Sequence, residues 1–354
     1  MRTYRIFGLI ILPLLASCAP GNPGITSTPY VTDSTNPPAS MPPPTELVVP
    51  TRVPRPTISP PTGTPPPELI NLMGLPAGIY LAVAEPGGLV AINIDGTPLG
   101  FFALGEIGIP AISPDLTTLA YDTTGGHFAF LHLDTGAEIL FEPYDMTRGR
   151  PSWSPWPHLL AVNGVNMNEA IQPHVGIIDM VEMSYTRLVD WAEGQHSPSW
   201  SPDGHWIAFT SDMAREDLTR DLYLLDTSCL SSLSSCAGSI EGPLLAGTAF
   251  DYSSPSWSPD SRLLAFGCGQ FDGQNEIERV CIMDLASRSI VRMLDTDQDT
   301  AYVYPSSWSP DGRWLAVVDP YPGRTGLMDP DTGELTWIID RPFVFWVDRR
   351  TPGR

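Results

Sequence analysis

The sequence places three aspartates at alternate positions, Asp295, Asp297 and Asp299. Hard cations such as Ca²⁺ bind several carboxylate oxygens held close together, and calcium loops open with this spacing. The glycine and the distal glutamate that usually complete such a loop do not follow, so a solvated turn between two folded elements explains the same residues. Calcium is the one cofactor that the sequence suggests, and the solvated turn is the competing interpretation.

Other residue types that catalyse reactions lack the spacing that catalysis needs. The chain has no lysine, which excludes Schiff-base and P-loop chemistry. Its six histidines form no H-E-x-x-H pair, and no G-x-S-x-G nucleophile elbow occurs. Four aspartates occupy the same place in a repeated turn, which favours capping over paired acid catalysis; they are Asp115, Asp203, Asp260 and Asp311. We therefore expect a protein that binds rather than catalyses.

Four cysteines in the second half of the chain predict disulfides. They form an even set, Cys229, Cys236, Cys268 and Cys281, in a chain that begins with an export signal. Sequential pairing is geometrically easiest, since each pair is separated by a short segment. A zinc site is the weaker alternative, because no C-x-x-C spacing and no suitably placed histidine accompany these cysteines.

One sequence motif, which we call the repeated phrase, occurs five times and in its fullest form is Pro-Ser-Trp-Ser-Pro-Asp-Gly. It indicates the elements that would position a site. The copies begin at Pro110, Pro151, Pro198, Pro255 and Ser306. Successive copies are 41, 47, 57 and 51 residues apart, close to the length of a four-stranded propeller blade. Tryptophan supplies an apolar wedge between neighbouring sheets, and Ser-Pro-Asp-Gly predicts a tight turn in which glycine takes a positive φ.

Strands are predicted on both sides of each turn. After the turn come short β-rich runs such as 206–210, 263–267 and 314–318, and a later run such as 222–226 ends in aspartate. Asp-Thr-Gly at 134–136 and at 331–333 suits a hairpin to a last strand. Four strands per repeat result.

These residues resemble the TolB-like, WD-like β-propeller repeat, which also occurs in the propellers of prolyl oligopeptidase relatives. The resemblance covers most of residues 78–347 and implies an all-β fold of six four-stranded antiparallel blades. The segment 78–104 provides only three strands of one blade, and the run 342–348 can be aligned with the repeated phrase. We therefore predict that the C-terminal strand closes the ring. The few residues beyond it leave no room for a hydrolase domain, so peptidase activity is not implied.

The resemblance also implies where a ligand would bind. In TolB-like propellers the turns crowd one face, and the loops before the inner strands surround a funnel on the other. The candidates at these positions are Arg150, His196, Asp251, Tyr252, Tyr302 and Tyr304. Ordinary solvated loop residues are the competing interpretation.

The first eighteen residues are typical of a lipoprotein signal. Arg2 and Arg5 precede the apolar run 6–12, and Leu-Ala-Ser-Cys at 15–18 resembles the lipobox of bacterial lipoproteins. That resemblance implies acylation of Cys18, and an ordinary signal peptide is the alternative. Residues 19–67 contain sixteen prolines and no apolar periodicity, which predicts a disordered linker, either unmodified or carrying O-linked sugars. The propeller is then expected over 68–354.

The net charge and the predicted cellular location limit the possible functions. Residues 68–354 contain 38 acidic and 15 basic side chains, a net charge of −23 that disfavours nucleic acid as a partner. We expect a monomeric, lipid-anchored, extracytoplasmic binding or scaffolding module for an envelope protein, an extracellular protein or a small ligand. The alternative is a propeller enzyme, a lactonase or a lyase, with a metal or polar site in the funnel.

Overall fold

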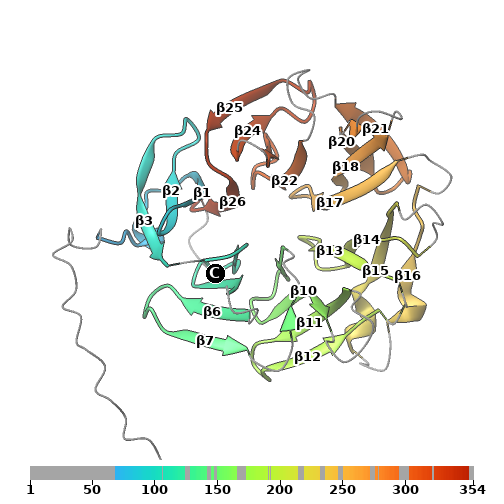
Figure 1. The fold of residues 1–354 in the computed structure, drawn as a ribbon, viewed down its shortest axis with the longest axis horizontal. Coiled ribbons are helices and arrows are strands. Elements are labelled where there is room, and N and C mark those ends of the chain that lie inside the picture. Colours follow the sequence, from blue (N-terminus) through green and yellow to red (C-terminus); the bar gives the residue numbers. More distant parts are fainter. Residues whose placement is uncertain are drawn as a thin grey trace, which may run out of the picture. The chain divides into compact units, whose positions relative to one another are not determined.

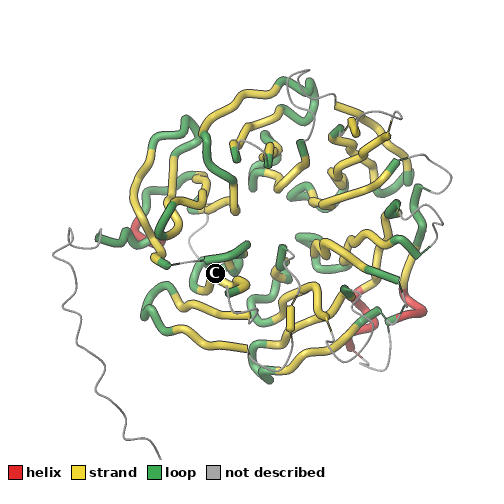
Figure 2. The backbone as a smooth tube through the Cα atoms, in the orientation of Figure 1, coloured by secondary structure: helices red, strands yellow, loops and turns green. Residues whose placement is uncertain are grey.

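The computed structural model describes residues 68–350 with internal gaps. The residues outside the description are 1–67, 106, 124–127, 142–144, 147–149, 166–172, 190, 192, 214–218, 232–235, 246–249, 272–275, 278, 295–302, 321–322 and 351–354. The described chain forms six antiparallel blades arranged as a ring (Figure 1). Strands make up the blades, and helix is confined to short segments (Figure 2). The predicted all-β, six-bladed propeller is therefore confirmed.

The first three blades follow one another from the start of the described chain. Blade 1 contains β26 (Phe343–Asp348), β1 (Ile79–Glu85), β2 (Gly88–Ile92) and β3 (Pro98–Leu104). Blade 2 contains β4 (Ala111–Ile112), β5 (Thr118–Asp122), β6 (Phe128–His132) and β7 (Glu138–Phe141). Blade 3 contains β8 (Asp145–Met146), β9 (Ser152–Trp153), β10 (Leu159–Val165), β11 (His174–Asp179) and β12 (Ser184–Arg187), and both β8 and β9 pair with β10.

The other three blades complete the ring. Blade 4 contains β13 (Gln195–Trp200), β14 (Trp206–Ser211), β15 (Asp221–Asp226) and β16 (Ile240–Glu241). Blade 5 contains β17 (Asp251–Trp257), β18 (Leu263–Phe271), β20 (Val280–Asp284) and β21 (Ser289–Leu294), with β19 (Glu276–Ile277) paired to β18. Blade 6 contains β22 (Tyr304–Trp308), β23 (Leu315–Asp319), β24 (Arg324–Met328) and β25 (Leu335–Ile339).

The chain's last strand closes the ring, as predicted. β26 pairs antiparallel with β1, from Ile79 opposite Asp348 to Val83 opposite Phe343. The two strands lie side by side although they are more than 250 residues apart in sequence (Figure 1). Through this pairing β26 supplies the inner strand of blade 1, which no segment close to blade 1 in the sequence provides.

Six apolar cores hold the blades together, one at each interface between neighbours. The inner strands contact one another in the closed order β4, β9, β13, β17, β22, β26 and back to β4. The core between blades 4 and 5 is representative: Leu222 and Leu224 of β15 pack with Tyr252 and Trp257 of β17. Burial of apolar surface between the blades is therefore the main force that keeps the inner strands in place.

The repeated tryptophan is the wedge that the sequence predicted. In four copies its indole Nε1–H donates to a carbonyl oxygen of the preceding blade, at 2.9–3.1 Å. The four bonds run from Trp153 to Ala111, from Trp257 to Ser199, from Trp308 to Ser256 and from Trp346 to Ser307. Trp200 differs, because its indole donates to Gly204 in its own turn while its backbone N–H donates to Ser152 Oγ of blade 3.

The Ser-Pro-Asp-Gly turns follow the predicted chemistry. In four copies the serine hydroxyl donates to the aspartate Oδ1 at 2.6 Å, and the same hydroxyl accepts a backbone N–H five residues after the serine at 2.9 Å. This hydrogen bond from Ser258 lowers the pKa of Asp260. Gly204 and Gly312 take positive φ angles of 80° and 74°, and Leu116 and Ser261 accept a similar φ at the same position. The aspartates are capping residues.

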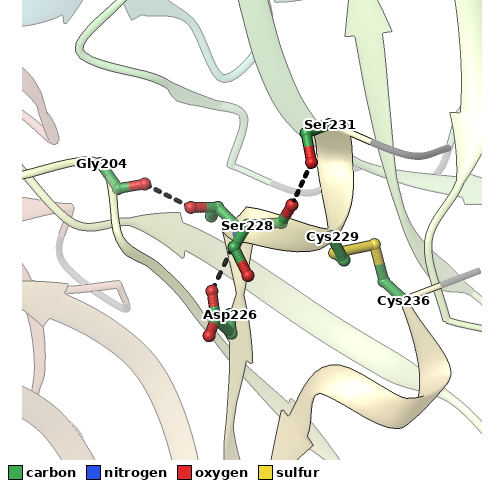
Figure 3. Close-up of a disulfide and its surroundings, with 7 residues drawn as sticks. Gly204, Asp226, Ser228, Cys229, Ser231 and Cys236 are labelled. Atoms are coloured by element: carbon green, nitrogen blue, oxygen red, sulfur yellow. Dashed lines mark hydrogen bonds between the residues drawn. A yellow bond between two sulfur atoms is a disulfide. The ribbon is translucent and has the colours of Figure 1, made fainter.

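Two disulfides join the four cysteines in sequential order. Cys229 pairs with Cys236, closing the loop between the 3-10 helices η2 (Thr227–Ser231) and η3 (Ala237–Ser239) (Figure 3). Cys268 of β18 pairs with Cys281 of β20, and both side chains are fully buried. With η1 (Leu72–Gly74) these are short helices, and no helix of the described chain has the length and apolar character needed to cross a bilayer.

Candidate functional site

A cavity of about 480 Å³ occupies the centre of the ring. Every blade lines it, through residues at or next to its inner strand. Its polar lining comes from Ser152, Ser197, Ser199, Ser254, Ser256, Ser306, Ser307, Arg150 and Tyr304. Its apolar lining comes from Ile109, Pro110, Ala111, Ile112, Pro114, Pro151, Trp153, Pro198, Pro255 and Phe345. We name this space the central channel.

The repeated phrase itself builds the channel wall. Its Pro-Ser pair precedes the tryptophan wedge, so it reaches the ring's centre in each blade that carries it. The pairing of the inner strand is irregular at this point, between His196 and Ser199 in blade 4 and between Ser253 and Ser256 in blade 5. Proline cannot donate to a strand ladder and is tolerated at such bulges. The bulge therefore places small hydroxyl side chains on the channel without breaking the blade.

Arg150 is the only charged residue among the described residues that line the channel. It precedes β9 in blade 3, and its Nη1 donates to the carbonyl oxygen of Ser306 in blade 6 at 2.8 Å and also to the Ser306 hydroxyl. Blades 3 and 6 are opposite in the ring, so the side chain crosses the channel. Burial lowers the pKa of Arg150, and Tyr304 opposes this shift. A guanidinium nonetheless keeps its charge at neutral pH.

Asp251 participates in an ion pair between blades 4 and 5. Arg220 binds its carboxylate with both Nε and Nη2, at 3.1 and 2.6 Å, and the Arg220 backbone N–H donates to the same carboxylate at 2.7 Å. Both side chains are about one-quarter to one-third exposed. Bidentate pairing of this kind positions the loop before β15 against the start of β17. Asp251 thus positions the start of the inner strand β17 and does not line the channel.

His196 lies beside this ion pair, on β13. Burial and the neighbouring Arg220 lower its pKa, while Asp212 and Asp251 act in the opposite direction. The uncharged imidazole is therefore favoured in the folded protein at neutral pH. Since the unfolded chain keeps the ordinary value of 6.5, it takes up the proton first as the pH falls.

This order of protonation predicts a pH-dependent stability. The neutral imidazole of His196 makes its full contribution to the free energy of unfolding above pH 6.5. This contribution decreases as the pH falls below that value, and it is lost once the pH is below the lowered folded pKa. We expect the thermal midpoint of the parent protein to decrease more between pH 7 and pH 5.5 than that of His196→Gln, so that the two curves converge. Calorimetry across this range measures the difference, and parallel curves would contradict it.

One further candidate residue, Tyr252, does not line the channel. Tyr252 is fully buried in the core, with its ring 5.4 Å from that of Phe266, because β17 begins at Asp251 and makes the tyrosine a strand residue rather than a loop residue. The expectation that Tyr252 faces the funnel is corrected accordingly. Tyr302 lies outside the described residues, as does the aspartate segment at 295–299. Within the described ranges no three His, Cys, Asp or Glu side chains gather to hold a metal.

The structure thus brings Arg150 and Tyr304 to the channel. It places His196 of blade 4 near Asp251 of blade 5, and neither residue is in the channel lining. The serine and proline lining was missed by the sequence reasoning, which treated the Pro-Ser pair as part of a structural repeat. A signal was present, because residues at one position of a propeller's inner strands must meet around the ring axis.

Comparisons with known proteins support the fold. No protein-family model matches the chain, and no curated protein matches it in sequence. TolB from Acinetobacter baumannii matches in structure with a TM-score of 0.55 and 21% identity, over 75% of this chain and 66% of that one. The tricorn protease matches with a TM-score of 0.52 and 10% identity, over 74% and 29% of the two chains. An oligogalacturonate lyase in complex with manganese matches with a TM-score of 0.52 and 12% identity, over 70% and 69%.

These matches define a class of protein. The chain is a six-bladed β-propeller that is structurally similar to TolB and to the tricorn propeller, at low sequence identity. It spans just under two thirds of the length of the Acinetobacter TolB chain. At such identities the likeness establishes the architecture, and function depends on the channel.

Proposed function

We propose that this protein is an extracytoplasmic binding module, anchored by an acylated Cys18, that engages a ligand or partner at its central channel. The central channel is the observation that supports this proposal. It is a space of about 480 Å³ lined by all six blades, and none of its described lining residues is acidic although residues 68–354 have a net charge of −23. Binding sites are typically concave, mostly apolar and supplied with a few polar groups, as this one is.

The cysteines support the cellular location. Two disulfides, one of them fully buried, are typical of proteins that fold in an oxidising compartment and indicate an extracytoplasmic location. The lipobox at 15–18 adds a membrane anchor to this location. The proline-rich segment 19–67 would then separate the propeller from the membrane.

Site-specific cross-linking in intact cells tests the binding role. A photoreactive amino acid replaces Ile109, which lines the channel and is 40% exposed. The matched control carries it at Val291, an outer-strand residue that is 48% exposed and does not line the channel. We expect a discrete cross-linked product from position 109 and none from position 291.

Two outcomes would contradict parts of the proposal. Equal products from both positions, or none from either, would contradict binding of a macromolecular partner at the channel. The anchor is checked in the same cells, because the full chain should sediment with membranes whereas Cys18→Ser should not. A Cys18→Ser protein that still sediments with membranes would contradict the anchor and leave the binding role unaffected.

A further inference from the structure

The guanidinium of Arg150 has donors that the described part of the protein does not use. Only its Nη1 is hydrogen-bonded, to the carbonyl and hydroxyl oxygens of Ser306, so within the described chain its Nε and Nη2 have no acceptor. The residue lines the channel, and no described carboxylate lies within ion-pair distance of it. Arg150 is partly buried and has no described anion beside it, so a negatively charged ligand in the channel would stabilise it.

We propose that the central channel binds a small organic monocarboxylate, with the carboxylate on the free Nε and Nη2 edge of Arg150. The inference deepens the binding role proposed above and rests on it. The Nε–Nη2 edge of a guanidinium presents two parallel N–H groups, which match the two oxygens of a carboxylate.

The charge balance of the channel selects a monoanion. Arg150 supplies one positive charge, and the described lining contributes no second cation. A carboxylate therefore leaves the pair neutral, whereas a phosphate dianion would leave one negative charge buried inside an already acidic domain. Hydroxyl groups of the lining serines can bind the ligand without adding charge.

The apolar part of the lining favours a ligand that carries an apolar organic group beside its carboxylate. Prolines from several blades, together with Trp153 and Phe345, provide apolar surface next to the cation. A volume of about 480 Å³ lies at the small end of ligand pockets, which range over roughly 300–1,000 Å³. Short aliphatic and single-ring carboxylates fit this combination of apolar wall and single charge.

A purely structural role for Arg150 makes a different prediction. If its task were only to connect blade 3 to blade 6 through Ser306, both Arg150→Gln and Ser306→Ala would lower the thermal midpoint and no anion would affect it. Under the proposal, benzoate raises the thermal midpoint of the parent protein and leaves that of Arg150→Gln unchanged.

The test is isothermal titration of the purified full chain with benzoate and propionate, and with benzamide and inorganic phosphate as matched probes. Benzamide keeps the ring and loses the charge, and phosphate keeps the charge and loses the apolar body. We expect saturable binding of a carboxylate, at least about tenfold stronger than that of either matched probe. Arg150→Gln should weaken it by about tenfold to a hundredfold, while the exposed Arg313→Gln should not change it.

Labelling of the unmutated protein covers the case in which Arg150→Gln fails to fold. Phenylglyoxal modifies accessible arginines, and peptide mass spectrometry reports modification at Arg150 separately from the others. Benzoate should slow labelling of Arg150 and leave that of Arg313 unchanged. Equal labelling with and without benzoate, tighter binding of phosphate, or no binding of either carboxylate would overturn the inference. A cross-linked partner at position 109 in any of these cases would keep the binding role and reject only the carboxylate.

Discussion

A chain truncated after Arg341 is expected to lose its stable fold. The truncation removes β26, whose Phe343, Phe345, Trp346 and Val347 are all buried. Full burial of a large apolar side chain contributes about 1.5–3 kcal/mol, so the four together represent on the order of 6–12 kcal/mol. Typical domains have a total stability of about 5–15 kcal/mol. The loss is therefore comparable to the whole free energy of unfolding.

The effect would extend to both sides of blade 1. Without β26, the strand β1 exposes the edge that now pairs with it, and Ser307 loses the indole donor of Trp346. An unpaired, apolar strand edge also promotes aggregation.

Thermal unfolding followed by circular dichroism measures the outcome. The matched control ends after Arg350, which keeps β26 and removes only the last four residues. We expect a cooperative transition for the control and none, or one at a much lower temperature, for the chain that ends at Arg341. An unchanged midpoint in the shorter chain would show that closure by the last strand is not needed for stability.

Trp257→Ala is expected to destabilise the propeller by about 3–5 kcal/mol. The side chain is only 6% exposed and packs in the core between blades 4 and 5. Its indole N–H also donates to the Ser199 carbonyl oxygen at 2.9 Å, so the substitution leaves both a cavity and an unpaired acceptor between the blades.

Urea denaturation of purified variants tests this prediction. Trp156→Ala is the matched control, because it makes the same chemical change at a residue that is 48% exposed, and a much smaller loss is expected there. Trp257→Phe should have an intermediate effect, since it keeps most of the apolar volume and loses the hydrogen bond. Equal losses from Trp257→Ala and Trp156→Ala would contradict the wedge role.

Much of the fold was predictable because its information is local and repeated. Ser-Pro-Asp turns form from hydrogen bonds that span five residues, so each copy of the phrase determines the same turn wherever it occurs. The tryptophan in the phrase has one environment that suits its size, the interface between blades. The incomplete first repeat and the run 342–348 together predicted closure, because a first blade without its inner strand would leave β1 with an unpaired edge.

The site was less predictable, because loop length and register decide which side chains reach the ring's centre. Tyr252 and Tyr304 precede their repeats at nearly the same distance, yet the first packs in the core and the second lines the channel. The contact of Arg150 with Ser306 joins residues 156 positions apart on opposite blades. No local sequence pattern predicts a contact between residues so far apart in the chain.

The sequence by itself therefore determined the number of blades, their turns, the tryptophan wedges, the closing strand and the sequential disulfides, since each depends on neighbours along the chain or on a repeated position. Only the tertiary structure decided that Arg150 would be the one charged residue in the described channel wall and that Asp251 would be paired with Arg220. Those relations arise when six blades pack into one ring and bring distant inner strands within hydrogen-bonding distance.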